Sequence, residues 1–233
     1  MTRIFLYIFF LWPLFACSKK DGISATVIPV EDSTESVTFL ALGDSYTIGQ
    51  SVSSSERFPA QTVALLRADG INIDEPDYIA TTGWTSIDLQ NAINTQNPAK
   101  HTVVTLLIGV NDQYRNHDTS GYRQRFTALL ENSVALANNK KENVFVLSIP
   151  DYSVTPFGAW YDTAQIRKEI DWFNAINKSV TLSYNIAYTD ITPSSREGRN
   201  DASLIAADDL HPSGLEYKKW AEMLAPLMNE VLQ

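Results

Sequence analysis

From residue 37 onward, short apolar segments alternate with longer segments in which apolar residues recur every three or four positions. A short apolar run is typical of a buried parallel strand, and a repeat of 3.6 residues is typical of a helix that buries one face. The predicted strands are Val37–Leu42, Asp77–Ala80, Thr102–Ile108, Asn143–Ser148 and Ile186–Asp190. The predicted helices are Pro59–Ala68, Ser86–Thr95, Tyr122–Asn138, Ala164–Tyr184 and Ser213–Leu232.

The regular alternation of strands and helices predicts an α/β fold. Right-handed crossovers between parallel strands place helices on both faces of the sheet. Local signals support two helix ends: Gly70 follows the first helix, where a left-handed residue ends it, and Ser213 with Glu216 has the spacing of a capping box. Residues 37–233 contain no internal repeat and no linker, so we expect them to form one domain.

The first residues resemble a targeting signal and are not expected to be part of this domain. Residues 1–16 contain one arginine and then an apolar run that is too short to span a bilayer comfortably, as in a secretory signal peptide. The segment Leu14-Phe15-Ala16-Cys17 resembles the bacterial lipobox, whose cysteine is acylated. We therefore expect a lipoprotein signal peptide over 1–16, lipidation at Cys17, a flexible tether over 17–36 and a lipid anchor in the bacterial cell envelope, periplasmic or surface-facing. A plain signal peptide or an uncleaved anchor is the alternative.

Composition narrows the possible functions. The 233 residues are 44% hydrophobic and 19% charged, which suits a folded domain with a core. Lys and Arg total 18 against 27 Asp and Glu, a net charge of -9 without a basic cluster, so nucleic acid is not an expected partner. Cys17 is the single cysteine, which excludes an internal disulfide, a cysteine zinc site and a cysteine nucleophile in the domain. No phosphate loop is present, and we expect neither a cofactor nor a metal.

Residues with catalytic chemistry follow the predicted strands. In a parallel α/β sheet, ligands bind beyond the carboxyl ends of the strands. Gly43-Asp44-Ser45 follows the first strand, Gly83 the second, and Gly109-Val110-Asn111-Asp112 the third. Asp208 and His211 come after the fifth strand, beyond a long loop.

These four blocks, in this order and spread over the whole domain, resemble the SGNH hydrolase superfamily, the GDSL-type esterases and lipases. The resemblance implies a three-layer α/β/α sandwich with a flavodoxin-like, five-stranded parallel sheet of order 2-1-3-4-5. It also implies that residues 37–233 form the SGNH hydrolase domain. The α/β-hydrolase fold is rejected because the turn around Ser45 lacks the second glycine of the G-x-S-x-G motif.

The resemblance also implies a role for each residue. Ser45 is the nucleophile, His211 its base, and Asp208 the acid that orients the imidazole from three residues away. The oxyanion hole consists of the Ser45 amide, the Gly83 amide and the Asn111 side chain. Glycine at position 83 suits a place where the backbone approaches the substrate closely.

Each assignment has a plainer alternative. Ser45 could cap a helix, Gly83 could be an ordinary loop glycine, Asn111 could be a turn residue that satisfies its own backbone, and the two acids Asp208 and Asp209 could solvate a loop. The remaining histidines, His101 and His117, are expected to be surface residues.

Strand order tests whether these residues can meet. In the order 2-1-3-4-5 the first three strands are neighbours, so Ser45, Gly83 and Asn111 converge. The fifth strand lies roughly 14 Å from the first, at about 4.8 Å per strand, so the chain must return across the sheet to bring His211 into place. The segment Ile191–Leu210 has the length to do so, and we expect it to be a functional loop.

The sequence thus predicts a metal-independent serine esterase that hydrolyses carboxylic esters through an acyl-enzyme. The substrate class stays open between a short-chain or acetyl ester, a lysophospholipid-like ester and an acetylated carbohydrate. The aromatic segment Pro150–Tyr161 could form a wall for an acyl group or a sugar, or simply cover the end of the sheet. A non-catalytic envelope lipoprotein that binds glycans, with a vestigial hydrolase site, is the alternative of a different class.

Overall fold

The computed structural model of the chain describes residues 35–117 and 119–233. The expected signal peptide, the lipidation site Cys17 and most of the expected tether lie outside the described residues.

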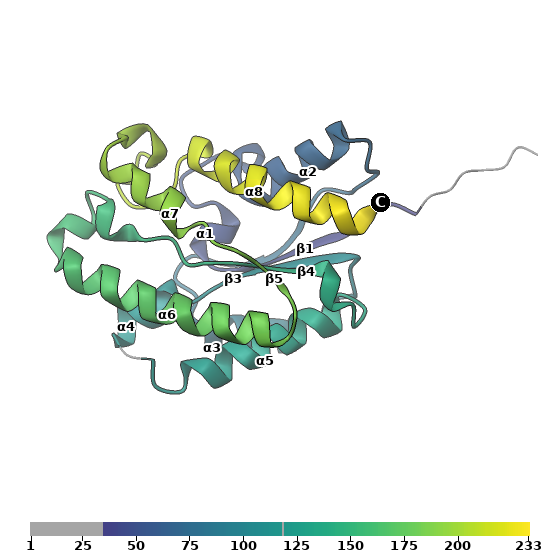
Figure 1. Ribbon diagram of the computed structural model, residues 1–233, viewed down its shortest axis with the longest axis horizontal. Helices are drawn as coiled ribbons and strands as arrows, with labels where there is room; N and C mark the ends of the chain where they lie inside the picture. The colour runs from purple at the N-terminus through teal and green to yellow at the C-terminus, as the bar shows by residue number, and fades with distance from the viewer. Residues whose placement is uncertain (1–34, 118) are drawn as a thin grey trace, which may run out of the picture. The chain divides into compact units, whose positions relative to one another are not determined.

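Five parallel strands form the central sheet (Figure 1). Their order is β2-β1-β3-β4-β5, which confirms the predicted 2-1-3-4-5 arrangement. Gly43 pairs with Ala80 on one side and Leu107 on the other, so the three neighbouring strands end at the same level. The strands are β1 (Phe39–Gly43), β2 (Asp77–Ala80), β3 (Val103–Leu107), β4 (Val144–Leu147) and β5 (Ala187–Thr189).

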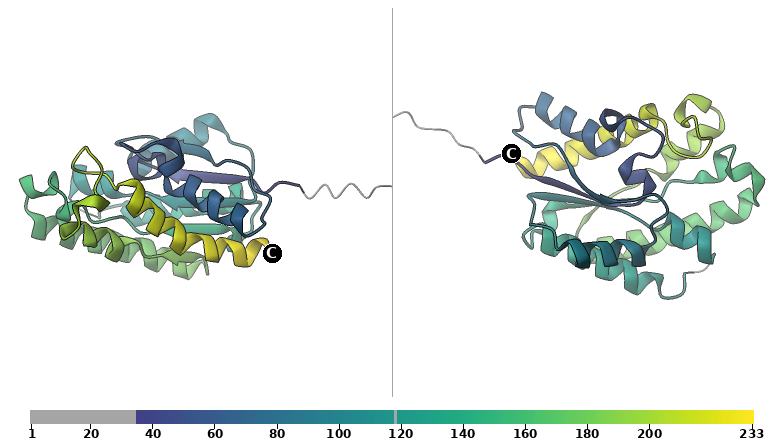
Figure 2. Two further views of the ribbon diagram at one scale, coloured as in Figure 1. Left: turned by 90° about the horizontal axis from the view of Figure 1, so that it is seen from above. Right: turned by 180° about the vertical axis from the view of Figure 1, so that it is seen from behind.

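Helices cover both faces of the sheet and complete the predicted three-layer α/β/α sandwich (Figures 1 and 2). One face carries α2 (Phe58–Ala68) and α8 (Gly214–Leu232), which pack against each other. The opposite face carries α3 (Ser86–Gln96), α5 (Tyr122–Leu136) and α6 (Thr163–Ser183).

The core explains why these segments adopt this arrangement. All residues of β1, β3 and β4 are buried, as expected for central strands with helices on both faces. On α8, Trp220, Leu224 and Met228 follow a spacing of four and are fully buried, and the Trp220 ring lies 6.1 Å from that of Phe58 on α2. Burying each such side chain contributes about 1.5–3 kcal/mol to stability.

Short helices are the main difference from the predicted elements. Three short helices were not predicted, because one or two turns are too short to show an apolar repeat: α1 (Ser45–Ile48), α4 (Val110–Asn116) and α7 (Thr192–Ser195). The segment 191–210, expected to be a loop, contains α7 and two 3₁₀ turns, Arg196–Arg199 and Ala202–Leu204.

The predicted helix ends are largely present. Gly70 has a φ of +90°, as expected after the end of α2. Ser213 caps α8, with Oγ accepting from the Glu216 amide at 3.4 Å. The other half of the capping box is missing because the Ser213 amide donates to Leu204 O (2.9 Å), while the buried Glu216 carboxylate accepts from Trp220 Nε1 (2.7 Å).

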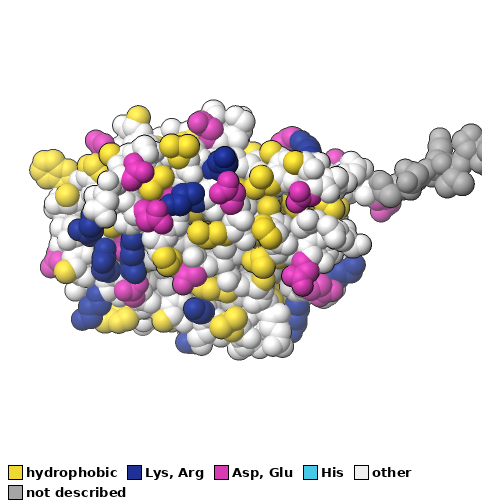
Figure 3. Space-filling model, turned by 45° about the horizontal axis from the view of Figure 1, so that its top comes forward, with side chains coloured by type: hydrophobic (Ala, Val, Ile, Leu, Met, Phe, Trp, Pro, Cys, Tyr) yellow, Lys and Arg dark blue, Asp and Glu magenta, His cyan; other side chains and the backbone are white. Residues whose placement is uncertain are grey.

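The surface mixes charges of both signs among apolar side chains on the face drawn in Figure 3. His117 is exposed, as expected. The expectation for His101 is wrong: it is only 7% exposed, and its two ring nitrogens contact Ala99 O (2.9 Å) and an Asp77 carboxylate oxygen (3.0 Å). Among the described residues, none of the helices has the length and apolar character that a membrane crossing requires.

Candidate active site

Ser45 lies at a tight turn directly after β1. Gly43 must be glycine because an added Cβ would lie 2.1 Å from Thr47 Oγ1 and 2.4 Å from Leu107 O. The Asp44 carboxyl group caps α1 by accepting from the Tyr46 amide at 3.0 Å. Ser45 is therefore the first residue of α1 and not its cap, and its amide has no acceptor within that helix.

Asp44 is fully buried beneath this turn. Burial raises the pKa of its carboxyl to about 8, against the lowering effect of the hydrogen bond from the Tyr46 amide, and the nearby Asp112 raises it further. The carboxyl is accordingly protonated near neutral pH, so the turn under Ser45 carries no negative charge.

Asp208 and His211 form a tight pair on the loop before α8. Asp208 Oδ2 lies 2.6 Å from His211 Nδ1, while Oδ1 accepts from the amides of Leu210 (3.1 Å) and His211 (2.9 Å). Because the carboxylate fixes Nδ1 as a donor, Nε2 is left as the proton acceptor of the ring. Asp209 has no part in this pair; its carbonyl accepts from the Phe157 amide at 3.0 Å.

The charge of Asp208 is strongly stabilised. Burial alone would raise its pKa, but hydrogen bonds from Ser51, His211 and Leu210 outweigh burial and lower the pKa to about 2. Ser51 donates from Oγ to Oδ2 at 2.6 Å. Ser51 was not predicted as a site residue, because no local sequence pattern distinguishes it from the serines that follow it.

Asn111 and Gly83 come from two neighbouring loops. Asn111, the second residue of α4, donates from Nδ2 to Trp84 O at 3.0 Å, which leaves the second amide hydrogen for another acceptor. The acceptor lies on the adjacent loop, so the Asn111 side chain does not hydrogen-bond to the backbone of its own turn. Gly83 has a φ of +84°, and Cβ at this position would meet no protein atom closer than Arg115 Nη2 at 3.8 Å. Backbone conformation therefore favours glycine here.

Asp112 holds these two loops together. Its buried carboxylate accepts from the amide (2.7 Å) and hydroxyl (2.6 Å) of Ser86 at the start of α3, and it pairs with Arg125 at 3.3 Å. The turn that carries Asn111 is thereby fixed against the helix that follows Gly83.

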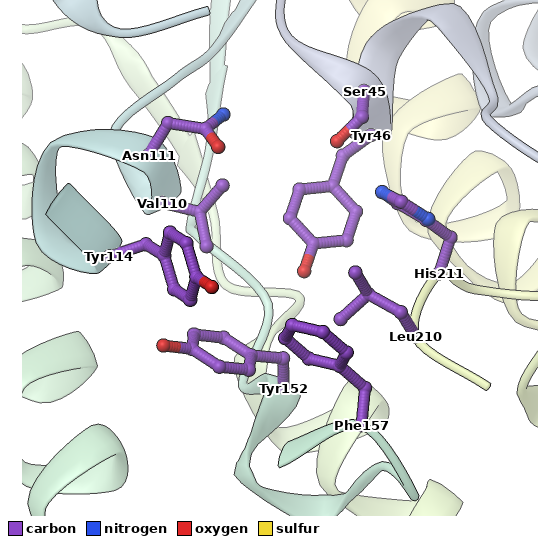
Figure 4. A pocket seen from close by; sticks show the side chains of 9 residues that line it. All are labelled: Ser45, Tyr46, Val110, Asn111, Tyr114, Tyr152, Phe157, Leu210 and His211. Atoms are coloured by element: carbon purple, nitrogen blue, oxygen red, sulfur yellow. The ribbon is translucent and has the colours of Figure 1, made fainter. Parts of the chain in front are cut away.

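A pocket joins most of the predicted residues (Figure 4). Ser45, Asn111 and His211 line it, and Gly83 does not. Ser45 and His211 lie on one side, and Asn111 and Tyr114 lie opposite them. The pocket contains about 440 Å³ of space between protein atoms, including its open mouth. The complete lining is Ser45, Tyr46, Val110, Asn111, Tyr114, Tyr152, Phe157, Leu210 and His211.

The aromatic segment 150–161 contributes part of this lining. Tyr152 and Phe157 border the pocket, whereas Trp160 is 87% exposed and does not. Among the described residues, no group of three or more His, Cys, Asp or Glu side chains is placed to hold a metal ion.

The sequence profile of the GDSL-like lipase/acylhydrolase family matches residues 41–219. No curated protein matches the chain in sequence.

Solved structures with the same fold include three hydrolases. A lipase/acylhydrolase from Enterococcus faecalis superposes with a TM-score of 0.65 at 17% identity, over 84% of this chain and 97% of the other. The lipase Lip_vut3 from a goat rumen metagenome gives 0.67 at 20% identity, over 85% and 100%. A variant of an acetyl xylan esterase from Geobacillus stearothermophilus gives 0.59 at 20% identity, over 82% and 94%. At these identities the likeness concerns the fold.

Proposed function

The chain belongs to the GDSL-like lipase/acylhydrolase family and is a hydrolase of ester bonds, and from this premise we propose that it cleaves short-chain carboxylic esters through an acyl-enzyme on Ser45. The observation that carries this proposal is the 2.6 Å contact between Asp208 Oδ2 and His211 Nδ1, beside a pocket that both His211 and Ser45 line.

In the first half of the reaction, Ser45 Oγ attacks the ester carbonyl carbon while His211 Nε2 takes the hydroxyl proton. The ionised Asp208 stabilises the imidazolium that forms. The negative charge on the carbonyl oxygen meets the amides of Ser45 and Gly83 and the Asn111 side chain. Collapse of the tetrahedral intermediate breaks the ester bond, and His211 returns the proton to the departing alcohol.

In the second half, water repeats these steps. His211 Nε2 removes a proton from water as the oxygen attacks the acyl-enzyme carbonyl, and the same donors hold the second oxyanion. Release of the carboxylic acid restores the Ser45 hydroxyl. No metal or cofactor is needed to balance either half.

The preference for a short acyl group is supported by the shape of the pocket. Tyr152 and Phe157 close the side away from Ser45, and their rings lie 6.5 Å apart. A long chain would have to leave the pocket and lie on the surface. The net charge of -9 also disfavours work on anionic lipid surfaces.

The test is turnover of p-nitrophenyl esters from acetyl to palmitoyl by protein that starts after Cys17. We expect activity that is highest for the shortest chains and is lost in Ser45→Ala, together with labelling of the wild type by a serine-reactive phosphonate. Ser55→Ala is the matched control, since Ser55 is an exposed serine outside the pocket. Undiminished turnover by Ser45→Ala would refute the nucleophile, and a preference for palmitoyl would refute the short-chain assignment.

We further propose that the chain is acylated at Cys17 and works as a lipid-anchored protein of the cell envelope. The support is the lipobox-like segment that ends at Cys17. The full chain, expressed in a bacterium fed a clickable fatty acid, should be labelled and found in the membrane fraction. Cys17→Ala should lose both properties, and labelling that persists in this variant would overturn the assignment.

A further inference from the structure

A second cavity adjoins the catalytic pocket on the side away from His211. Tyr114 and Tyr152 line both spaces, so the two adjoin at these rings. The second cavity lies between α4 and the first turns of α6 and contains about 700 Å³, including its open mouth. Its other lining residues are His117, Tyr161, Asp162, Gln165, Ile166 and Glu169.

A buried carboxylate forms the base of this cavity. The Glu169 side chain is 1% exposed, and its oxygens contact Gln113 Nε2 (2.6 Å), His117 Nδ1 (3.1 Å) and Gln165 Nε2. Burial would raise its pKa, but these hydrogen bonds outweigh burial and the pKa is lowered. The base of the cavity is therefore a buried, ionised carboxylate whose oxygens already have partners, and the exposed Gln165 and His117 are polar groups at the edge.

Aromatic rings form the wall nearest to the catalytic pocket. The rings of Tyr114 and Tyr161 meet edge to face at 6.0 Å, and their hydroxyls lie 3.0 Å apart. Phe157 supports Tyr161 with a centroid distance of 5.4 Å. Tyr161 is 48% exposed, so much of its ring area is available to a ligand.

This lining excludes two classes of ligand. An acyl chain would cover the exposed polar side chains of His117 and Gln165 without offering them a hydrogen-bond partner, which is unfavourable. A phosphate group would meet the negative charges of Glu169 and Asp162. A neutral ring with an apolar face and hydroxyls around its edge fits both the tyrosine wall and the polar edge.

We propose that this cavity binds a neutral sugar ring in the alcohol part of the substrate while the ester carbonyl lies at Ser45. The inference rests on the proposed esterase function and specifies its substrate as an esterified carbohydrate. Tyr161 supplies a ring face, and Gln165 supplies an amide for the sugar hydroxyls.

The kinetic test compares kcat/KM for acetylated xylobiose with kcat/KM for p-nitrophenyl acetate. Tyr161→Ala should lower the ratio of the two values by about tenfold, which corresponds to about 1.4 kcal/mol of lost binding. Gln165→Ala should lower the ratio in the same direction. Trp172→Ala is the matched control, because Trp172 is another exposed aromatic residue on α6, is 47% exposed and contacts Lys168 instead of the cavity. Its ratio should stay at the wild-type value.

A binding measurement separates this proposal from the esterase assignment. Calorimetric titration of Ser45→Ala protein with xylobiose should give a binding signal that Tyr161→Ala removes in the same background. If p-nitrophenyl acetate is turned over but xylobiose does not bind and the ratios do not change, the sugar site is wrong and the esterase stands. If choline or decanoate binds in a Tyr161-dependent manner and xylobiose does not, the sugar site is also wrong. If the wild-type protein turns over none of the esters, the esterase assignment itself is wrong.

Discussion

Ser51 and Asp208 are joined by a 2.6 Å hydrogen bond from Oγ to Oδ2, the same carboxylate oxygen that contacts His211 Nδ1. Ser51 belongs to the turn that follows the Ser45 helix, so this bond ties the segment of the nucleophile to the acid. Its φ of +69° is uncommon for a residue with a side chain and costs on the order of 1 kcal/mol. The hydroxyl that bonds Asp208 is therefore carried by a residue with a strained backbone conformation.

Replacing Ser51 should make the Asp208 carboxylate less effective in catalysis and leave the fold intact. Ser51→Ala removes a donor to a charged group, so the pKa of Asp208 should rise and kcat for p-nitrophenyl acetate should fall by about tenfold. Ser51→Gly should lose the same activity but be about 0.5–1 kcal/mol more stable than Ser51→Ala, because both variants lack the hydroxyl and glycine adopts the positive φ without strain. Ser55→Ala should change neither quantity. Full kcat in Ser51→Gly would show that the hydroxyl is not used.

The hydrogen bond between Ser51 and Asp208 also predicts how the stability of the fold depends on pH in the acidic range. The pKa of Asp208, about 2, lies below its ordinary value of 3.8, so the ionised group stabilises the fold above about pH 4, and this contribution is lost as the pH falls towards 2. In Ser51→Ala the folded pKa moves closer to 3.8 and the contribution shrinks. Urea unfolding at pH 6 and pH 3 should show a smaller loss of stability in the variant than in the wild type. An equal loss would contradict the assignment.

Asn111 should act on the transition state rather than on substrate binding. Asn111→Ala removes a donor to the developing oxyanion, and kcat should fall by about 10²–10³ with little change in KM. Asn116→Ala, at the exposed end of the same helix, is the control. A rise in KM with an unchanged kcat would assign Asn111 to ground-state binding instead.

The sequence was sufficient to predict the sheet because its strands are short apolar runs separated by long amphipathic helices. The strand order came from the resemblance to a family, and it brought Ser45 and Asn111 to one edge. Ser51 and Glu169 could not be predicted, since each matters only through a partner on a distant segment. His101 was misjudged for the same reason: it precedes β3, and its partner Asp77 lies at the start of β2.

Asp112 should support both stability and catalysis. Asp112→Ala leaves the Ser86 amide without its buried acceptor and Arg125 without its carboxylate partner, which should cost about 1–3 kcal/mol, and the turn that carries Asn111 should lose its anchor. We expect a lower midpoint of thermal unfolding together with a lower kcat. Asp112→Asn keeps an acceptor for Ser86 and should recover part of both. A variant that loses stability but keeps the full kcat would limit Asp112 to a structural role.

Asp44 should make the fold less stable as the pH rises. The pKa of its carboxyl is about 8 in the folded protein against an ordinary value of 3.8, so between these values the folded state holds a proton that the unfolded state has lost. Stability therefore falls with rising pH across this window and levels off above it. Asp44→Asn keeps an oxygen to accept from the Tyr46 amide and removes the titration. Its stability relative to the wild type, from urea unfolding at pH 5 and pH 8, should be greater at pH 8. Asp69→Asn, an exposed control, should show no such difference, and a constant gap between Asp44→Asn and the wild type would contradict the assigned pKa.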